Sequence, residues 1–353
     1  MALALTEPTD AALLWLRHVQ LDVEARLLEL LELPDEQGID PRWSDALVHT
    51  REYARRPAKR LRPALVAMGH GLGAGHAEVP EGLWTFAAAF ELLHTFLLIH
   101  DDVADRAERR RGSPALHRVL APGKLGEDLA VVVGDHLFAR SIEAMLGTGL
   151  PGAARAVRYY LGVCRQTAAG QYLDLDLTRV PLSEVTLFRT LRVAHLKTAR
   201  YGFVAPLVCG AMLAGAPRAL IERMDRVGRH VGLAYQLRDD LIGLFGDSQI
   251  AGKSTDGDFV QGKRTFPVLA AYTRAPAATR AEMEMLWTER PIDPVALIRA
   301  RTLVTAHEGV AATERLIERA TRSARRALAS LPHGGGFRDL LDSLILTLSQ
   351  RRS

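Results

Sequence analysis

The stretch ELLHTFLLIHDDVAD, residues 91–105, decides the fold and points to a site. An apolar run with helical spacing ends there in a group of aspartates. In an α-helix, Asp101 and Asp105 lie on one face, about 6 Å apart along the axis, and Asp102 is turned by about 100°. Carboxylates where a helix leaves the core are costly unless cations meet them. Because Mg²⁺ takes one or two protein carboxylates together with phosphate oxygens, we expect a diphosphate held through divalent metal.

A second acidic pair ends the run Tyr235-Gln236-Leu237-Arg238-Asp239-Asp240. Gln236 is three residues from Asp239 and four from Asp240, so these side chains share one helical edge. The residue four positions after Asp239 is Gly243, so this pair makes a weaker metal site than the first. Asp239 is the better ligand, since its face continues the apolar stripe. Asp240 fits a helix cap or a surface acid equally well.

Basic residues occur near both acidic pairs in the sequence. They are Lys59, Arg60 and Arg62 before Pro63, Arg110 and Arg111 before Gly112, Lys197 beside Thr198, and Lys253 and Lys263 in a Gly-rich segment. Arg binds phosphate bidentately, and Lys supplies a compact charge. Each residue alone fits a solvated surface position, but together they favour a phosphate site. His94, two turns before Asp101, fits this site or an ordinary core position.

The composition is that of a soluble protein with a large core. Its 353 residues are 48% hydrophobic and 24% charged, and the formal net charge is +4. Short Arg runs without aromatic stacking residues exclude a nucleic-acid surface. Cys164 and Cys209 have no metal-ligand spacing, which predicts a reducing compartment. We find no signal-peptide core and no uncharged stretch of bilayer length, so we expect a cytoplasmic protein without a transmembrane segment.

Apolar residues recur with helical spacing along most of the chain. We expect helices over residues 11–33, 81–100, 125–145, 153–177, 182–213, 219–245, 268–287 and 309–331, separated by Gly-, Pro- and Asp-rich breaks. Val131-Val132-Val133 alone would pass for a strand, but its flanks are helical and we assign it to a helix. The sequence predicts one all-α domain over residues 1–353, with the motifs in a core of about 40–345.

The motifs between Lys59 and Lys263 resemble those of the trans-isoprenyl diphosphate synthases, the polyprenyl synthetase family. Residues 59–63 are similar to the family's KRxRP segment, 91–105 to its ExxH…DDxxD segment, and 110–112 to its RRG. Residues 197–198 match its KT pair, 236–240 match its second aspartate-rich region, and 252–253 and 262–265 match the segments after it. Each motif alone is weak, but the ordered set is specific. Gly243 departs from the pattern, because many members carry a third aspartate there.

The resemblance implies an isoprenoid synthase-type helical bundle around a deep central cavity, in a homodimer. It implies a transferase that condenses isopentenyl diphosphate 1'-4 with an allylic diphosphate: dimethylallyl, geranyl or farnesyl. Each active site would hold three Mg²⁺ when diphosphate is bound. The metal ligands would be Asp101, Asp105 and Asp239, with Asp102 and Asp240 as further ligands. Arg110, Lys197 and Lys253 would assist on the allylic diphosphate, and Lys263 would be a further substrate-binding residue. Lys59, Arg62, His94 and Arg111 would bind isopentenyl diphosphate. Thr198 and Gln236 would stabilise positive charge on the allylic carbons.

Product length is predicted from the residues four and five before the first aspartate, which often form the floor of the chain pocket in this family. Here they are Leu97 and Phe96. This pair favours geranylgeranyl diphosphate, with farnesyl diphosphate as the alternative. Phe96 packed in a dimer core is the competing interpretation.

Other functions remain open from the sequence. They are a class I terpene cyclase, a non-catalytic or regulatory subunit of a heteromeric prenyl synthase, and a helical scaffold without chemistry. The second aspartate region and residues 59–63 argue against a cyclase. The intact carboxylates and arginines of the first region argue against a non-catalytic subunit.

Overall fold

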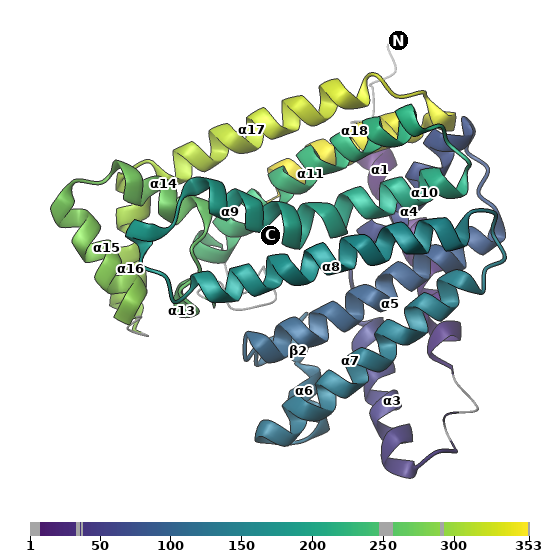
Figure 1. The fold of residues 1–353 in the computed structure, drawn as a ribbon, viewed down its shortest axis with the longest axis horizontal. Coiled ribbons are helices and arrows are strands. Elements are labelled where there is room, and N and C mark those ends of the chain that lie inside the picture. The colour runs from purple at the N-terminus through teal and green to yellow at the C-terminus, as the bar shows by residue number, and fades with distance from the viewer. Residues whose placement is uncertain (1–7, 33–35, 37, 247–256, 290–292, 352–353) are drawn as a thin grey trace, which may run out of the picture. The chain divides into compact units, whose positions relative to one another are not determined.

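A computed structural model describes residues 8–32, 36, 38–246, 257–289 and 293–351 (Figure 1). Regular structure in these residues is helical apart from a hairpin of two-residue strands, so the all-α prediction is confirmed. The chain groups into two compact units. Unit 1 is Met1–Tyr159, Pro206–Ile221 and Pro332–Leu341, and unit 2 is Tyr160–Ala205, Glu222–Leu331 and Asp342–Ser353. The single domain and its central cavity stay predictions.

Unit 1 contains the first aspartate region. Its elements are α1 (Pro8–Leu31), α3 (Pro41–Arg55), α4 (Leu61–Ala74), α5 (Glu81–Ala104), β1 (Arg109–Arg110), β2 (Ser113–Pro114), α6 (Leu116–Leu120), α7 (Gly123–Leu146), most of α10 (Ala205–Leu213) and η3 (Gly334–Gly336). Helix α5 packs along α7 and also contacts α1 and α4. A Cβ on Gly69 of α4 would lie 2.2 Å from the Leu207 carbonyl oxygen, so α4 and α10 touch through their backbones.

Unit 2 contains the second aspartate region. Its elements are η1 (Leu182–Glu184), α9 (Leu187–Val193), the π-helix η2 (Ala194–Val204), α13 (Gly257–Val260), α14 (Phe266–Arg274), α15 (Ala277–Glu289), α16 (Pro294–Ala306) and α17 (Gly309–Leu328). Helices α8 (Ala153–Leu177), α11 (Arg218–Phe245) and α18 (Phe337–Gln350) contribute residues to both units. Trp287 is fully buried in one apolar cluster of unit 2, and Leu237 is fully buried in another.

The helix predictions hold for the long amphipathic segments and fail at interruptions. Residues 131–133 lie within α7, as predicted. The predicted helix 182–213 is broken into η1, α9, the π-helix and α10. The predicted helix 268–287 is two helices, because Pro276 lacks an N–H and drives Ala275 to φ −73°, ψ 147°. Helices α3, α4, α6, α13, α16 and α18 were not predicted.

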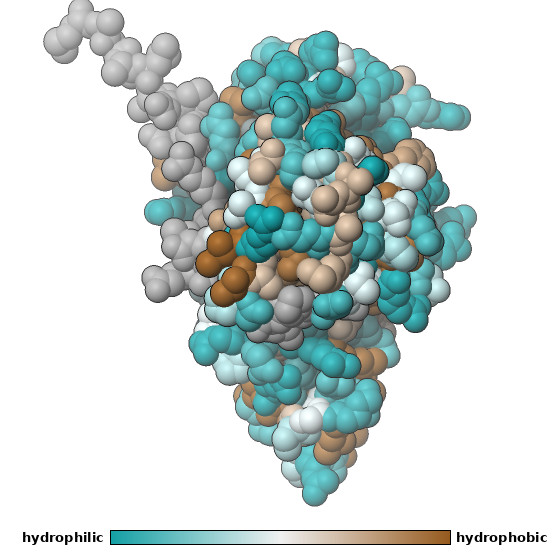
Figure 2. Space-filling model, turned by 90° about the vertical axis from the view of Figure 1, so that its left-hand side faces the viewer, coloured by the Kyte–Doolittle hydropathy of each residue, from teal (hydrophilic) through white to brown (hydrophobic). Residues whose placement is uncertain are grey.

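Helix α5 is long and apolar enough to cross a membrane by length and composition. Glu91 interrupts its apolar run, so it is not the uncharged stretch whose absence was expected. Of its most apolar window, 61% is buried inside the protein, which is typical of a core helix. On the face drawn in Figure 2, hydrophilic side chains predominate and hydrophobic ones gather in small groups.

Candidate active site

The first aspartate region closes α5. Asp105 is the C-terminal cap, and its N–H donates to the Asp101 carbonyl oxygen at 2.8 Å. This bond keeps Asp101 and Asp105 one turn apart on one face, as predicted. The last turn, Asp101 to Ala104, contains no basic residue, although the C-terminal end of a helix dipole disfavours negative charge. A cation from outside the helix is therefore needed at this end.

Asp102, between these two in sequence, is fully buried. Its Oδ2 accepts a 2.7 Å hydrogen bond from the Tyr53 hydroxyl, and its Oδ1 accepts from Nε (2.7 Å) and Nη2 of Arg110. Burial opposes the Arg110 charge, but the Asp102 carboxylate outweighs it and raises the Arg110 pKa. These contacts favour a role for Asp102 in holding Arg110 over the predicted role as a metal ligand.

A cluster of guanidinium groups surrounds His94 in unit 1. Burial lowers the pKa of His94 well below its usual value, and the charges of Arg62, Arg111 and Arg110 lower it further. Arg111 has a left-handed backbone (φ 53°), and its Nη1 donates to the Arg56 carbonyl oxygen at 3.3 Å. The structure thus brings together three residues predicted to bind isopentenyl diphosphate, Arg62, His94 and Arg111. Lys59, the fourth, is exposed just before α4.

Arg60, inside the KRxRP segment, has a role that the sequence analysis missed. It is fully buried with φ 44°, and its Nη1 lies 3.1 Å from Glu91 Oε2. Its Nη2 donates to the Ala54 carbonyl oxygen at 2.9 Å. Glu91 in the apolar run of α5 could have revealed this role of Arg60, because a buried carboxylate requires a cationic partner.

Lys197 lies in the π-helix of unit 2 and pairs with Asp174 of α8. The distance from Lys197 Nζ to Asp174 Oδ2 is 2.7 Å, and Lys263 Nζ lies 4.0 Å from the same oxygen. Burial opposes the Asp174 charge, but Lys197 and Lys263 outweigh it and lower the pKa of Asp174. Short π-helical stretches are frequent at functional sites. Asp174 is a site residue that the sequence analysis missed.

Thr198, Gln236 and Asp240 form a hydrogen-bonded chain in unit 2. The Thr198 hydroxyl donates to Gln236 Oε1, and Gln236 Nε2 donates to Asp240 Oδ1 at 2.7 Å. Asp240 is 7% exposed, so the alternative of a surface acid or helix cap is wrong. Burial raises the pKa of Asp240 to about 8, and the nearby Asp258 and Asp239 carboxylates add to the rise against the Gln236 hydrogen bond.

Asp239 is paired with the C-terminal Arg351. Arg351 Nη2 contacts Asp239 Oδ1, and the Arg351 guanidinium lies 3.9 Å from the centre of the Tyr235 ring. The Arg351 side chain is 11% exposed and that of Asp239 33%. The best ligand candidate of the second region therefore carries a cation from the end of the chain.

Comparison with known proteins identifies the family. The polyprenyl synthetase family model matches residues 45–300. The chain belongs to the polyprenyl synthetase family. The resemblance drawn from its motifs is thereby confirmed.

Relatives of this polyprenyl synthetase family member differ in product. It is 36% identical over 228 residues to (2E,6E)-farnesyl diphosphate synthase of Mycobacterium bovis; this match covers 64% of the chain and 59% of the relative, less than two thirds of that relative's length. It is 36% identical over 260 residues to geranylgeranyl diphosphate synthase of Mycobacterium tuberculosis, covering 72% and 70%. The crystal structure of geranylgeranyl pyrophosphate synthase from Corynebacterium glutamicum, complexed with isoprenyl diphosphate and magnesium, has a TM-score of 0.85 at 27% identity, over 95% of this chain and 99% of that chain.

The donor set of this family member fits magnesium shared with a diphosphate. Within the part of the chain that the structure describes, no group of three or more His, Cys, Asp or Glu side chains forms a metal cage. Mg²⁺ does not require one, because it binds through one or two carboxylates plus substrate phosphates. Asp101 with Asp105 in unit 1, and Asp239 in unit 2, supply such hard oxygen donors. Lys253 lies outside the described residues, so its predicted role stays a prediction.

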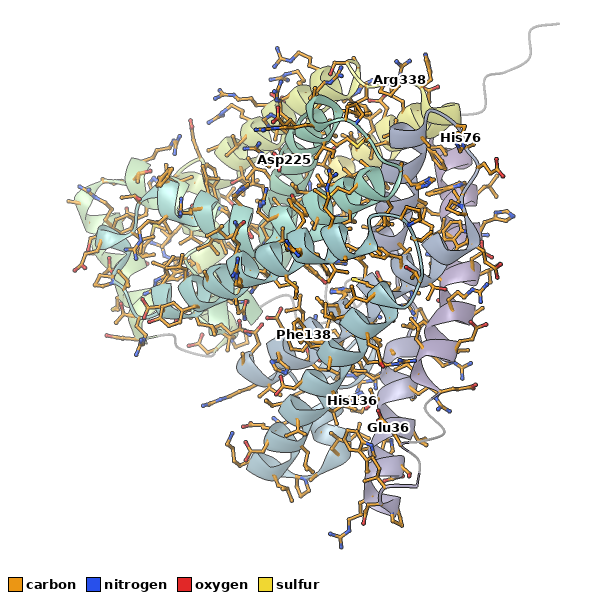
Figure 3. All side chains as sticks on the ribbon, turned by 45° about the vertical axis from the view of Figure 1, so that its right-hand side comes forward. Glu36, His76, His136, Phe138, Asp225 and Arg338 are labelled. Atoms are coloured by element: carbon orange, nitrogen blue, oxygen red, sulfur yellow. The ribbon has the colours of Figure 1, made fainter. Side chains whose placement is uncertain are left out.

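Phe96, one of the two predicted chain-length residues, lies on the α7 side of α5. The Phe96 ring packs against Phe138 of α7, with centroids 5.4 Å apart, and against His100 at 4.5 Å. Phe138 is labelled in Figure 3 on the same helix as His136, whose Nε2 lies 3.4 Å from Glu36 Oε2. Phe96 and Leu97 are half-buried. Their role in product length stays a prediction.

Proposed function

We propose that this protein condenses isopentenyl diphosphate with an allylic diphosphate, in a Mg²⁺-dependent 1'-4 reaction whose product is geranylgeranyl diphosphate. Family membership supports the reaction class. The observation that carries the proposal is the pairing of residues from different family motifs within each unit. Arg110 is held by Asp102, and Lys197 is held next to Thr198 and its partner Gln236.

The first step is departure of the diphosphate from the allylic substrate. Asp101, Asp105 and Asp239 would hold Mg²⁺, which when bound would supply positive charge to neutralise the departing diphosphate. Arg110 and Lys197 add fixed positive charges that need no reorganisation during the step, because Asp102 and Asp174 already orient them.

Oxygen atoms of the chain stabilise the allylic cation that remains. The Thr198 hydroxyl oxygen and Gln236 Oε1 are held together by their hydrogen bond, so both present partial negative charge without a full anion that the cation could alkylate. The isopentenyl double bond then attacks the cation, and the new cation loses a proton to the released diphosphate.

Isopentenyl diphosphate would be bound by Lys59, Arg62, His94 and Arg111. The pKa of His94 is lowered, so His94 is neutral at pH 7 and contributes an N–H donor instead of a charge. The arginines supply the charge for the second diphosphate. The cluster stays cationic without adding a further buried charge.

A homodimer in the cytoplasm completes the proposal. Helix α7 exposes Leu125, Leu129 and Val132, which recur at spacings of four and three and make an apolar row. A second copy of the chain is the occupant we assign to this row. Light scattering during size-exclusion chromatography should give the dimer mass for the native chain and a lower mass for Val132→Glu.

Product analysis of the purified chain tests the reaction. The chain is incubated with labelled isopentenyl diphosphate and dimethylallyl, geranyl or farnesyl diphosphate, with Mg²⁺ or EDTA, and the dephosphorylated products are chromatographed. We expect Mg²⁺-dependent geranylgeraniol. Farnesol as the end product would favour the alternative function, to which a 36% identical relative points.

Other outcomes would reject the proposal. Consumption of the allylic diphosphate alone would indicate a terpene cyclase. If the chain binds diphosphate with Mg²⁺ but shows no turnover, it is a non-catalytic subunit. If it does not bind diphosphate, it is a scaffold. Phe96→Ala should lengthen the products if Phe96 limits chain growth, and an unchanged product profile would assign Phe96 to packing alone.

A further inference from the structure

The hairpin that carries Arg110 and Arg111 is too small to hold its own shape. Strands β1 and β2 have two residues each, and they are joined by Arg111 (φ 53°) and Gly112 (φ 78°). A two-residue type I′ turn requires positive φ at both central residues, which glycine adopts readily and arginine does not. An isolated two-stranded hairpin is at best marginally stable in water. Contacts from outside the hairpin are therefore needed to keep Arg111 in this backbone conformation.

Arg56, the residue that follows α3, makes such contacts. Its side chain is 5% exposed, and its Nη1 donates to the Pro114 carbonyl oxygen at 2.8 Å and to the Arg110 carbonyl oxygen at 3.3 Å. One guanidinium nitrogen thus bonds to both strands of the hairpin. In the other direction, Arg111 Nη1 donates to the Arg56 carbonyl oxygen at 3.3 Å. The backbone of the hairpin and the side chain of its turn are fastened to the same residue.

The Arg56 side chain is itself oriented by α3. Its Nε and Nη2 donate to the two carboxylate oxygens of Glu52, at 3.2 and 2.9 Å, and its Cζ lies 4.7 Å from the centre of the Tyr53 ring. A planar guanidinium can bind a carboxylate along one edge and still present Nη1 to other acceptors, because its five N–H donors point in fixed directions. Lysine has a single nitrogen and cannot make both sets of contacts at once.

The two arginines of the hairpin depend on Arg56 to different degrees. The Arg110 side chain has an anchor of its own, because Asp102 accepts from its Nε and Nη2. The Arg111 side chain donates to Arg56 instead, and its charge acts on the buried His94. Loosening of the hairpin should consequently displace Arg111 more than Arg110.

We propose that Arg56 is a positioning residue for isopentenyl diphosphate, which fixes the hairpin so that Arg111 keeps its place in the cationic cluster around His94. This inference rests on the proposed function, in which that cluster binds isopentenyl diphosphate. Arg56 precedes the KRxRP segment, which begins at Lys59, so the family motifs described above do not include it. Its contribution is to hold a residue that binds substrate, without touching the substrate itself.

Steady-state kinetics of the full-length chain tests this role. The KM for each diphosphate is measured with the other saturating, for the native chain, Arg56→Met, Arg56→Lys and Arg55→Met. Arg56→Met should raise the KM for isopentenyl diphosphate on the order of tenfold and that for the allylic diphosphate by less than about threefold, because a displaced binding group loses its interaction. Arg56→Lys keeps the charge with fewer hydrogen bonds and should give a smaller rise. Arg55→Met changes an exposed neighbour and should alter neither KM.

The reciprocal variant separates positioning from a general loss of structure. Asp102→Asn weakens the anchor of the Arg110 side chain and leaves the contacts of Arg56 in place. It should therefore raise the KM for the allylic diphosphate more than that for isopentenyl diphosphate, the opposite of Arg56→Met. If Arg56→Met does not fold, Arg56→Lys takes its place in this comparison, and its smaller rise should still be larger for isopentenyl diphosphate.

A second measurement needs no substrate. The Ala115 N–H donates to the Glu108 carbonyl oxygen at 3.0 Å, next to the paired residues of β1 and β2. In amide hydrogen exchange followed by mass spectrometry, Arg56→Met should speed exchange over residues 108–115 and leave exchange in α7 as in the native chain.

The failures are distinguishable. A native chain that does not condense the two diphosphates would overturn the proposed function, and this inference with it. An active native chain in which Arg56→Met raises both KM values equally, or raises neither, would overturn this inference alone. Unchanged hydrogen exchange over residues 108–115 in Arg56→Met would overturn it as well.

Discussion

Asp102→Asn would show whether Asp102 holds Arg110 or binds metal. The Asp102 side chain is 1% exposed and accepts hydrogen bonds from Tyr53 and Arg110, and the Arg110 side chain is 18% exposed. Removing one partner of a buried ion pair costs about 3–5 kcal/mol, because the other charge stays buried and unpaired. Since Arg110 keeps some exposure, we take the lower end and expect a loss of about 3 kcal/mol. That is a large part of a total stability of about 5–15 kcal/mol.

Urea unfolding without metal, followed by circular dichroism, measures this loss. Two variants calibrate it. Tyr53→Phe removes one hydrogen bond to Asp102 and should cost about 1 kcal/mol. Asp101→Asn removes a half-buried carboxylate at the unfavourable end of α5, so its stability should change by less than about 1 kcal/mol.

Metal dependence separates the two roles. In thermal unfolding with inorganic pyrophosphate, Asp101→Asn should lose the Mg²⁺-dependent shift, whereas Asp102→Asn should retain most of it on a lower baseline. Native-like urea stability of Asp102→Asn together with a lost Mg²⁺-dependent shift would make Asp102 a metal ligand and refute the reasoning.

Further predictions concern the C-terminus, Asp174 and His94. Arg351→Ala should lower the half-saturating Mg²⁺ concentration several-fold by freeing Asp239, and Arg351→Lys should leave it unchanged. If Arg351→Ala instead needs a higher Mg²⁺ concentration in enzyme assays, Arg351 binds diphosphate. Asp174→Asn should reduce kcat/KM for the allylic diphosphate by about tenfold, because a charge-assisted hydrogen bond contributes about 1.5–3 kcal/mol. Asp176→Asn is the control, since its partner Arg179 is exposed. An equal loss of kcat/KM in Asp176→Asn would contradict this prediction. Because the pKa of His94 is lowered in the folded protein, the protein loses stability as the pH falls below the unfolded-state pKa of histidine, about 6.5. His94→Gln should remove about 1.4 kcal/mol of destabilisation between pH 7.5 and 5.5 in urea unfolding, and identical pH profiles would refute it.

The sequence predicted what depends on spacing within one helix. Asp101 and Asp105 share a face because four residues make one turn, and the hydrogen bond at the end of α5 keeps that geometry. Gln236 and Asp240 are hydrogen-bonded for the same reason. The long helices α5, α7, α8 and α11 follow from a periodicity that tertiary contacts do not override.

The sequence did not predict what depends on contacts between helices. Asp174 lies in an alternation of Leu and Asp that fits a solvated face, and its partner Lys197 is 23 residues away on another helix. The sequence left undecided whether Asp240 lies on the surface or in the interior, because its burial depends on what packs against α11. The π-helix around Lys197 has no distinct apolar period. The break at Pro276 was within reach of local rules and was overlooked.

The left-handed backbones of two arginines limit how this protein can be made more heat-resistant. A non-glycine residue with positive φ carries about 1–2 kcal/mol of strain, which glycine relieves. At Arg111 that exchange removes a guanidinium from the cluster around His94, and at Arg60 it leaves the buried Glu91 without its counter-charge. Arg106 (φ 51°) is exposed and belongs to neither arrangement. An engineer seeking thermal tolerance should therefore begin with Arg106→Gly and leave the other two untouched.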